Sequence, residues 1–107
     1  MRKHALNLAE VLVELQLRAG DPANVRDPLA AIRVYLAEQA GHEEARVLRL
    51  VIGGLMSGRV SLRVDDLAIL TPAGAQLAAA LVDARLSGVY ADAEWRSAAL
   101  SLVSPSH

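Results

Sequence analysis

The fold predicted from this sequence depends on one stretch, Gly58-Arg59-Val60-Ser61-Leu62-Arg63-Val64-Asp65-Asp66-Leu67-Ala68-Ile69-Leu70-Thr71-Pro72. From Arg59 to Val64 polar and apolar residues alternate strictly, which is typical of a β-strand because successive strand side chains point to opposite faces. Asp65-Asp66 then provides a two-residue turn, and residues 67–70 return as a second strand. We therefore predict a β-hairpin, with a short helix over residues 64–70, capped by Asp65, as the alternative.

Helical periodicity predicts three helices before this stretch, over residues 5–19, 28–40 and 42–57. The second begins at Asp27-Pro28, because Asp accepts hydrogen bonds from the first amides of a helix and Pro fits the first helical position. The third contains Gly53-Gly54, and since glycine weakens a helix, this pair predicts close approach by another backbone.

Two further helices are predicted after the hairpin. Thr71 is an N-cap followed by Pro72, and this helix runs to about Leu86 before Gly88 closes it. Asp92 caps a last short helix that carries Trp95. Residues 104–107 form a tail, so the 107-residue chain is interpreted as one small, mainly α domain over residues 1–103 with a single β-hairpin.

The composition excludes several classes of protein. The chain has no cysteine, which rules out a disulfide framework and a thiolate metal site, and its net charge of −1 gives no global basic field. Glu10 and Glu14 interrupt the segment after the basic N-terminus, so it does not form the apolar part of a signal peptide. We expect a cytoplasmic protein without a membrane segment.

No arrangement of residues typical of an active site is found. The three histidines have no partner at metal-ligand spacing, and His42-Glu43-Glu44 lacks the second histidine of a zinc motif. Asp65 and Asp66 would point to opposite faces of a strand, where they could not share a proton or a metal ion. We therefore predict no catalytic residues, no metal, no cofactor and no enzymatic activity.

The basic residues of the middle of the chain are all arginines. A guanidinium can bind phosphate through two hydrogen bonds and can contact guanine edges, so these residues are candidates for nucleic-acid binding. Alternatively they form a solvated face. The candidates are Arg46, Arg49, Arg59 and Arg63.

The order of three helices, a hairpin and a capped helix resembles the winged helix-turn-helix of MarR- and PadR-type regulators. Residues 35–50 are similar to the turn between the two central helices of that fold, and residues 55–60 to the end of its recognition helix. Residues 70–74, Leu-Thr-Pro-Ala-Gly, are similar to the exit from the wing. The resemblance covers residues 35–86.

This resemblance implies a small homodimeric regulator that binds DNA. Arg46 and Arg49 would face the major groove, and Arg59 and Arg63 would approach phosphates from the wing. The terminal helices would form the dimer interface, for which the candidate residues are Leu6, Leu8, Val13, Leu17, Trp95 and Leu102.

The sequence departs from the winged-helix pattern in ways that favour a second hypothesis. The helix over residues 42–57 is unusually apolar for a recognition helix, and Asp65-Asp66 would repel phosphates. The helix over residues 5–19 has one narrow polar stripe, so it requires a second layer or a second subunit. The alternative function is a non-enzymatic helical module for protein–protein interaction, such as an adaptor or a chaperone-like protein.

Overall fold

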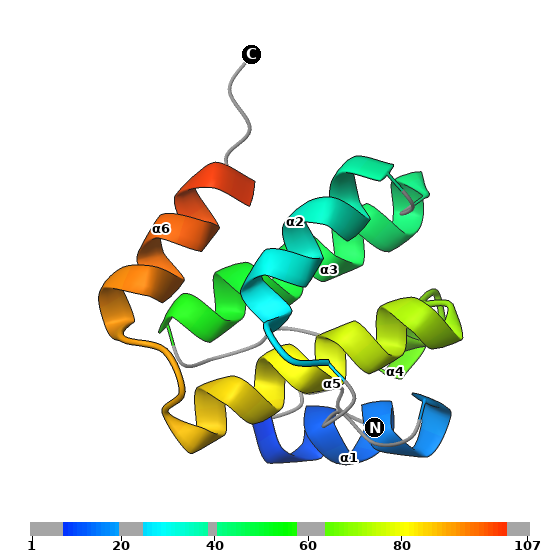
Figure 1. Cartoon of the computed structure of the whole chain (residues 1–107). Coiled ribbons are helices and arrows are strands. Elements are labelled where there is room, and N and C mark those ends of the chain that lie inside the picture. Colours follow the sequence, from blue (N-terminus) through cyan, green and yellow to red (C-terminus); the bar gives the residue numbers. More distant parts are fainter. Residues whose placement is uncertain (1–7, 20–24, 39–40, 58–63, 103–107) are drawn as a thin grey trace.

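A computed structural model describes residues 8–19, 25–38, 41–57 and 64–102 of the chain. Within these ranges every regular element is a helix (Figure 1). The elements are α1 (Leu8–Ala19), α2 (Pro28–Glu38), α3 (His42–Ser57), α4 (Val64–Leu67), α5 (Pro72–Ser87) and α6 (Asp92–Leu102).

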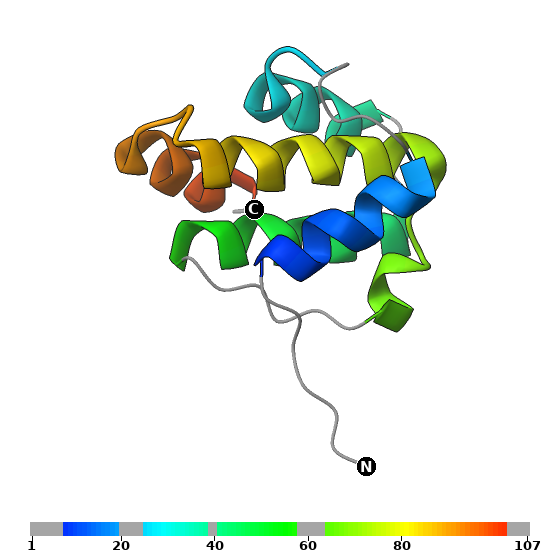
Figure 2. The ribbon, with the colours of Figure 1, turned by 90° about the horizontal axis from the view of Figure 1, so that it is seen from below.

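Helix α5 lies at the centre of the fold. It contacts α1, α2 and α3, and Figure 2 shows it running between α2 on one side and α1 and α3 on the other. Its buried residues are mostly small, which lets several helices approach its backbone closely. They are Gly74, Ala75, Leu77, Ala78, Ala79, Ala80, Leu81, Val82 and Ala84.

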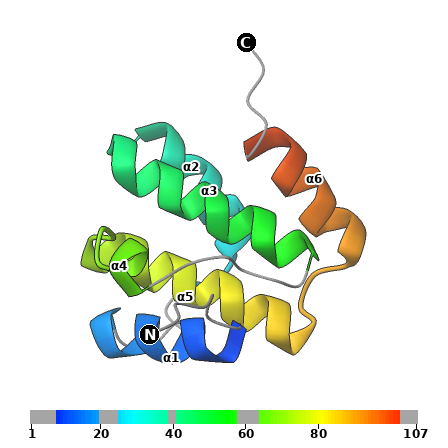
Figure 3. The ribbon, with the colours of Figure 1, turned by 180° about the vertical axis from the view of Figure 1, so that it is seen from behind.

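Helix α3 is also part of the core. It packs against α5 and α6, and in the view from behind (Figure 3) its C-terminal half lies next to α6. Residues at helical spacing along it are fully buried, namely Val47, Leu48, Val51, Ile52 and Leu55. Trp95 of α6 is 1% exposed and is the largest of the fully buried side chains.

The predicted β-hairpin is wrong, because the described residues contain no strand and residues 64–67 form the short helix α4. The amides of Ile69 and Leu70 donate to the carbonyls of Asp66 and Leu67, both at 3.1 Å, so the chain continues in tight turns. A strand would place Leu67 and Ile69 on one face, but Leu67 and Leu70 are the buried pair and Ile69 is exposed. The first predicted strand, residues 59–63, lies outside the described residues. The mainly helical part of the prediction holds, but the winged-helix-like fold class does not.

Three of the predicted helix boundaries are confirmed. Asp27 caps α2, since its Oδ1 accepts from the amide of Ala30 at 3.4 Å and Pro28 is the first helical residue. Thr71 caps α5, with its Oγ1 accepting from the amide of Gly74 at 3.2 Å. Gly88 ends α5 in the left-handed conformation, with φ of 70°. These signals are local, so the sequence alone is sufficient to read them.

The predicted cap of the last helix is wrong. The carbonyl of Ala91, rather than that of Asp92, accepts the first amides of α6, from Glu94 at 2.9 Å and from Trp95 at 3.2 Å. The Glu94 side chain in turn accepts from the Ala91 amide at 2.9 Å. Asp92 already lies within the helix, and its carboxylate pairs with Arg85 at 3.3 Å. This arrangement leaves Glu94 fixed at the start of α6.

A buried carboxylate joins α2, α3 and α5. Glu44 is buried, and its Oε1 accepts from the hydroxyl of Tyr35 at 2.8 Å. Its Oε2 accepts from both the amide and the hydroxyl of Thr71, at 2.9 Å each. A buried charge is tolerated when hydrogen bonds replace its water, and here the donors come from two neighbouring helices. Glu44 therefore fixes the start of α5 against α2 and α3.

Candidate functional site

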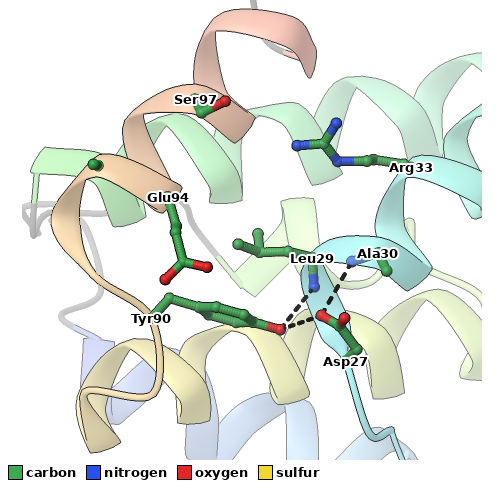
Figure 4. A pocket seen from close by; sticks show the side chains of 8 residues that line it. Asp27, Leu29, Ala30, Arg33, Tyr90, Glu94 and Ser97 are labelled. Atoms are coloured by element: carbon green, nitrogen blue, oxygen red, sulfur yellow. Dashed lines mark hydrogen bonds between the residues drawn. The ribbon is translucent and has the colours of Figure 1, made fainter.

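A pocket of about 400 Å³ lies between the first turns of α2 and α6 (Figure 4). The two helices contribute a mixture of charged, hydroxyl and apolar side chains. The described residues that line it are Asp27, Leu29, Ala30, Arg33, Tyr90, Ala93, Glu94 and Ser97. Its volume lies near the lower end of the range of about 300–1,000 Å³ that is usual for small-molecule sites.

Tyr90 closes one side of this pocket and ties it to the start of α2. Its hydroxyl donates to Oδ1 of Asp27 at 2.5 Å and accepts from the amide of Leu29 at 3.3 Å. The Tyr90 ring also packs edge-on against Trp95, with ring centroids 5.4 Å apart. The position of the pocket is therefore fixed by contacts between α2, α6 and the loop before α6.

The hydrogen bond between Tyr90 and Asp27 shifts the acidities of both groups. The bond from Tyr90, helped by the bond from the Ala30 amide, lowers the pKa of Asp27. Burial of the Tyr90 ring is the main cause that raises the pKa of its hydroxyl, and the bond to Asp27 adds to it. At neutral pH Asp27 is therefore charged and Tyr90 keeps its proton.

Charges of opposite sign face each other across the pocket. Figure 4 shows the Arg33 side chain extending from α2 towards α6, whereas the carboxylate of Glu94 lies on the α6 side. Among the described residues the Arg33 guanidinium has no hydrogen-bond or ion-pair partner. Glu94 uses one oxygen to bind the Ala91 amide. Chemically the pocket can hold a charged or polar ligand.

A second surface feature is the outward side of α1. Val13 is 54% exposed and Leu17 is 77% exposed, and with the exposed Ala9 they recur every four residues. We call these three residues the α1 strip. A shallow pocket of about 310 Å³ lies against it, lined by Ala9, Glu10, Val13 and Glu14. Val11 and Leu15, in contrast, are buried against the rest of the fold.

The structure places the predicted dimer residues in different environments. Val13 and Leu17 lie on the exposed α1 strip. Leu8 begins α1 and Leu102 ends α6, while Leu6 lies outside the described residues. Trp95 is 1% exposed within the core of this chain and so offers no surface to a partner. Only part of the predicted set therefore shares one face.

The structure describes two of the four predicted nucleic-acid-binding residues. Arg46 is half exposed and pairs with Glu43 at 3.2 Å, with Asp66 at 4.0 Å on its other side. Arg49 is partly buried on the same helix, and Arg59 and Arg63 lie outside the described residues. The buried residues of α3 lie on one side of the helix, and the other side exposes His42, Glu43, Arg46 and Leu50.

The pocket between α2 and α6 was not predicted. Asp27 and Tyr90 are 63 positions apart, and no periodicity links them. The acidic residue three positions after Ala91 is the one local signal, because such a residue can bind back to the start of a helix. That signal identifies a cap and gives no indication of a pocket.

Comparisons with known proteins add no relationship, since no family model, curated protein or solved structure matches the chain. In the part of the chain that the structure describes, no three metal-ligating side chains gather. No helix within the described ranges is long and apolar enough to cross a membrane.

Proposed function

We propose that this chain is a non-enzymatic helical protein-interaction module that pairs with a second copy of itself through the α1 strip. The observation that carries the proposal is the exposure of Val13 and Leu17, one helical turn apart on the same face of α1. Burial of a large aliphatic side chain is worth about 1.5–3 kcal/mol, so an unpartnered pair of this kind favours association.

The charges beside the strip fit a second copy in an antiparallel orientation. Glu14 and Arg18 flank Leu17, and neither has an ion-pair partner among the described residues. If Val13 of one copy lies opposite Leu17 of the other, Glu14 of each copy lies about 3 Å along the helix axis from Arg18 of its partner. A twofold axis would form this contact twice, as expected for a self-complementary interface.

The size of the surface sets the expected strength. One helical strip buries less area than the roughly 1,600 Å² of a standard stable interface, so the dimer should be weak and should depend on protein concentration. The paired charges lie at the rim, where they favour one orientation more than they add affinity.

Sedimentation velocity over a range of concentrations tests this proposal. The wild-type chain should shift from monomer to dimer, and the double variant Val13→Ser/Leu17→Ser should remain monomeric. Leu86→Ser/Leu100→Ser is a matched control, because Leu86 is 50% exposed and Leu100 is 62% exposed on other helices. A wild-type chain that stays monomeric, or a dimer that the α1 double variant leaves intact, would overturn the proposal.

A charge swap tests the orientation separately. Glu14→Arg should weaken the dimer because it places like charges opposite Arg18, and Arg18→Glu in the same chain should restore it. A parallel pair would place Glu14 opposite Glu14, so it would not respond in this way.

A further inference from the structure

The pocket between α2 and α6 has one side that suits an anion. The guanidinium of Arg33 extends over it and has no partner among the described residues, and the hydroxyl of Ser97 stands on the facing helix (Figure 4). The first amides of α2 already have acceptors and are not available to bind an anion. The Leu29 amide donates to the Tyr90 hydroxyl, and the Ala30 amide donates to Asp27. Arg33 is therefore the group on α2 that can bind a carboxylate.

The opposite side of the pocket suits a cation. Glu94 is held at the start of α6 because its Oε1 accepts from the Ala91 amide, and this leaves Oε2 to accept from a ligand. Asp27 stands nearby at the start of α2, and its pKa is lowered by the bonds from Tyr90 and Ala30, so it adds a second negative charge. A ligand ammonium would be attracted to this side and repelled by Arg33.

The remainder of the lining is apolar. Leu29, Ala30 and Ala93 contribute side chains without polar atoms, and the Tyr90 ring borders them. In Figure 4 the Leu29 side chain lies between Glu94 and Arg33. An aliphatic side chain of a ligand that is held by the two charges can therefore pack on Leu29.

We propose that this pocket binds a small zwitterion, namely an α-amino acid with an aliphatic side chain. Its carboxylate would bind Arg33 and Ser97, its ammonium would bind Glu94, and its side chain would lie on Leu29. This ligand site is separate from the α1 strip and does not depend on dimer formation.

Titration of the full chain with L-leucine, followed by amide NMR shifts, tests the proposal. Saturable shifts should be confined to the first turns of α2 and α6. N-acetyl-L-leucine lacks the ammonium and L-leucinamide lacks the carboxylate, so each should bind about tenfold more weakly or worse, as expected when a charged hydrogen bond is lost. Binding of L-leucinamide equal to that of L-leucine would contradict the role of Arg33.

Single substitutions test whether Arg33 and Glu94 bind the two charged groups of the ligand. Arg33→Gln and Glu94→Gln should each weaken binding of L-leucine about tenfold or more. Gln at position 94 still offers an oxygen to the Ala91 amide, so the start of α6 is kept. Arg96→Gln is the matched control, because Arg96 is exposed on α6 and does not line the pocket, and it should leave binding unchanged.

Two results would overturn the proposal. One is the absence of saturable shifts up to the solubility limit of L-leucine, as expected if Arg33 and Glu94 close onto each other. The other is binding that Arg33→Gln and Glu94→Gln leave unchanged. The titration is repeated with Leu17→Ser to distinguish this proposal from that of the dimer. This variant should bind L-leucine as the wild type does, since loss of the dimer should not alter the pocket.

Discussion

The carboxylate of Glu44 occupies the space where a side chain at Gly74 would begin. A Cβ built on Gly74 would overlap Oε2 of Glu44, and it would lie 2.8 Å from Cδ of Glu44 and 3.3 Å from the hydroxyl of Tyr35. Gly74 is in the first turn of α5, next to Thr71, which donates to the same carboxylate. Glycine is therefore needed here for close approach, with no requirement for a special backbone angle.

Gly74→Ala should destabilise the fold by about 1–3 kcal/mol, because the new methyl group must displace a buried carboxylate that is held by three hydrogen bonds. Urea unfolding followed by circular dichroism measures the change. Gly41→Ala is the control without a steric clash, since a Cβ at Gly41 meets nothing within 4 Å, and its effect should stay below about 1 kcal/mol because Gly41 precedes α3, where Ala is less favourable than Gly.

A double-mutant cycle tests whether the cost at Gly74 arises from Glu44. Glu44→Ala should cost about 1–3 kcal/mol by itself, because it leaves the amide of Thr71 without its acceptor and removes the carboxylate to which the hydroxyls of Tyr35 and Thr71 donate. In Gly74→Ala/Glu44→Ala the methyl group no longer meets the carboxylate, so the double variant should be more stable than the sum of the single effects predicts. Additive free energies would show that the two residues do not interact.

The helix ends that could be predicted from the sequence are those set by local signals. The N-caps Asp27 and Thr71 and the closing Gly88 each act on amides or carbonyls within one turn, so the residue type is sufficient. The alternation over residues 59–64 is also local, but the structure of the segment that follows is determined by packing against the core. Leu67 and Leu70 are both buried, and their spacing of three suits a helical turn. The sequence of the segment is compatible with both a hairpin and a short helix, so it does not by itself decide between them.

The candidate pocket could not be predicted from the sequence, because it depends on contacts between distant residues. Its walls come from α2 and α6, and the bond between Asp27 and Tyr90 that fixes them joins positions 63 apart. The sequence does show that α1 has more apolar surface than one core needs, and the exposure of Val13 and Leu17 agrees with this. In the case of Trp95, the sequence could not distinguish a core residue from an interface residue, because both environments favour a large aromatic side chain.

The bond between Tyr90 and Asp27 predicts how stability changes in acid. The pKa of Asp27 in the folded chain lies below its usual value of 3.8, mainly because of the bond from Tyr90. The unfolded chain therefore binds a proton more readily, so this contribution is present above that value and is lost as the pH falls through the folded pKa. Tyr90→Phe should make unfolding less dependent on pH in this range. An unchanged pH profile would contradict this assignment.

The buried Tyr35 predicts a loss of stability in alkali. Burial raises the pKa of Tyr35 above its usual value of 10.0, and the carboxylate of Glu44 raises it further. The hydrogen bond between the hydroxyls of Tyr35 and Thr71, 3.0 Å apart, acts in the opposite direction and lowers it. Because the folded pKa is higher, the contribution is present below about pH 10 and is lost as the pH rises through the folded value. Tyrosinate absorbance should therefore appear at higher pH in the native chain than in the urea-unfolded chain. Tyr35→Phe should remove part of this difference, and coincident titrations would rule the effect out.

The indole of Trp95 gives the last prediction, because its Nε1 is buried and has no hydrogen-bond partner among the described residues. An unsatisfied buried donor costs about 1–3 kcal/mol, which offsets part of what the large ring contributes by packing. Trp95→Phe removes this donor and keeps an aromatic ring against Tyr90, so its stability should lie within about 1.5 kcal/mol of the wild type. Trp95→Ala leaves a cavity and should cost about 3–5 kcal/mol. Thermal unfolding of the two variants measures the difference, and a Phe variant as unstable as the Ala variant would contradict this expectation.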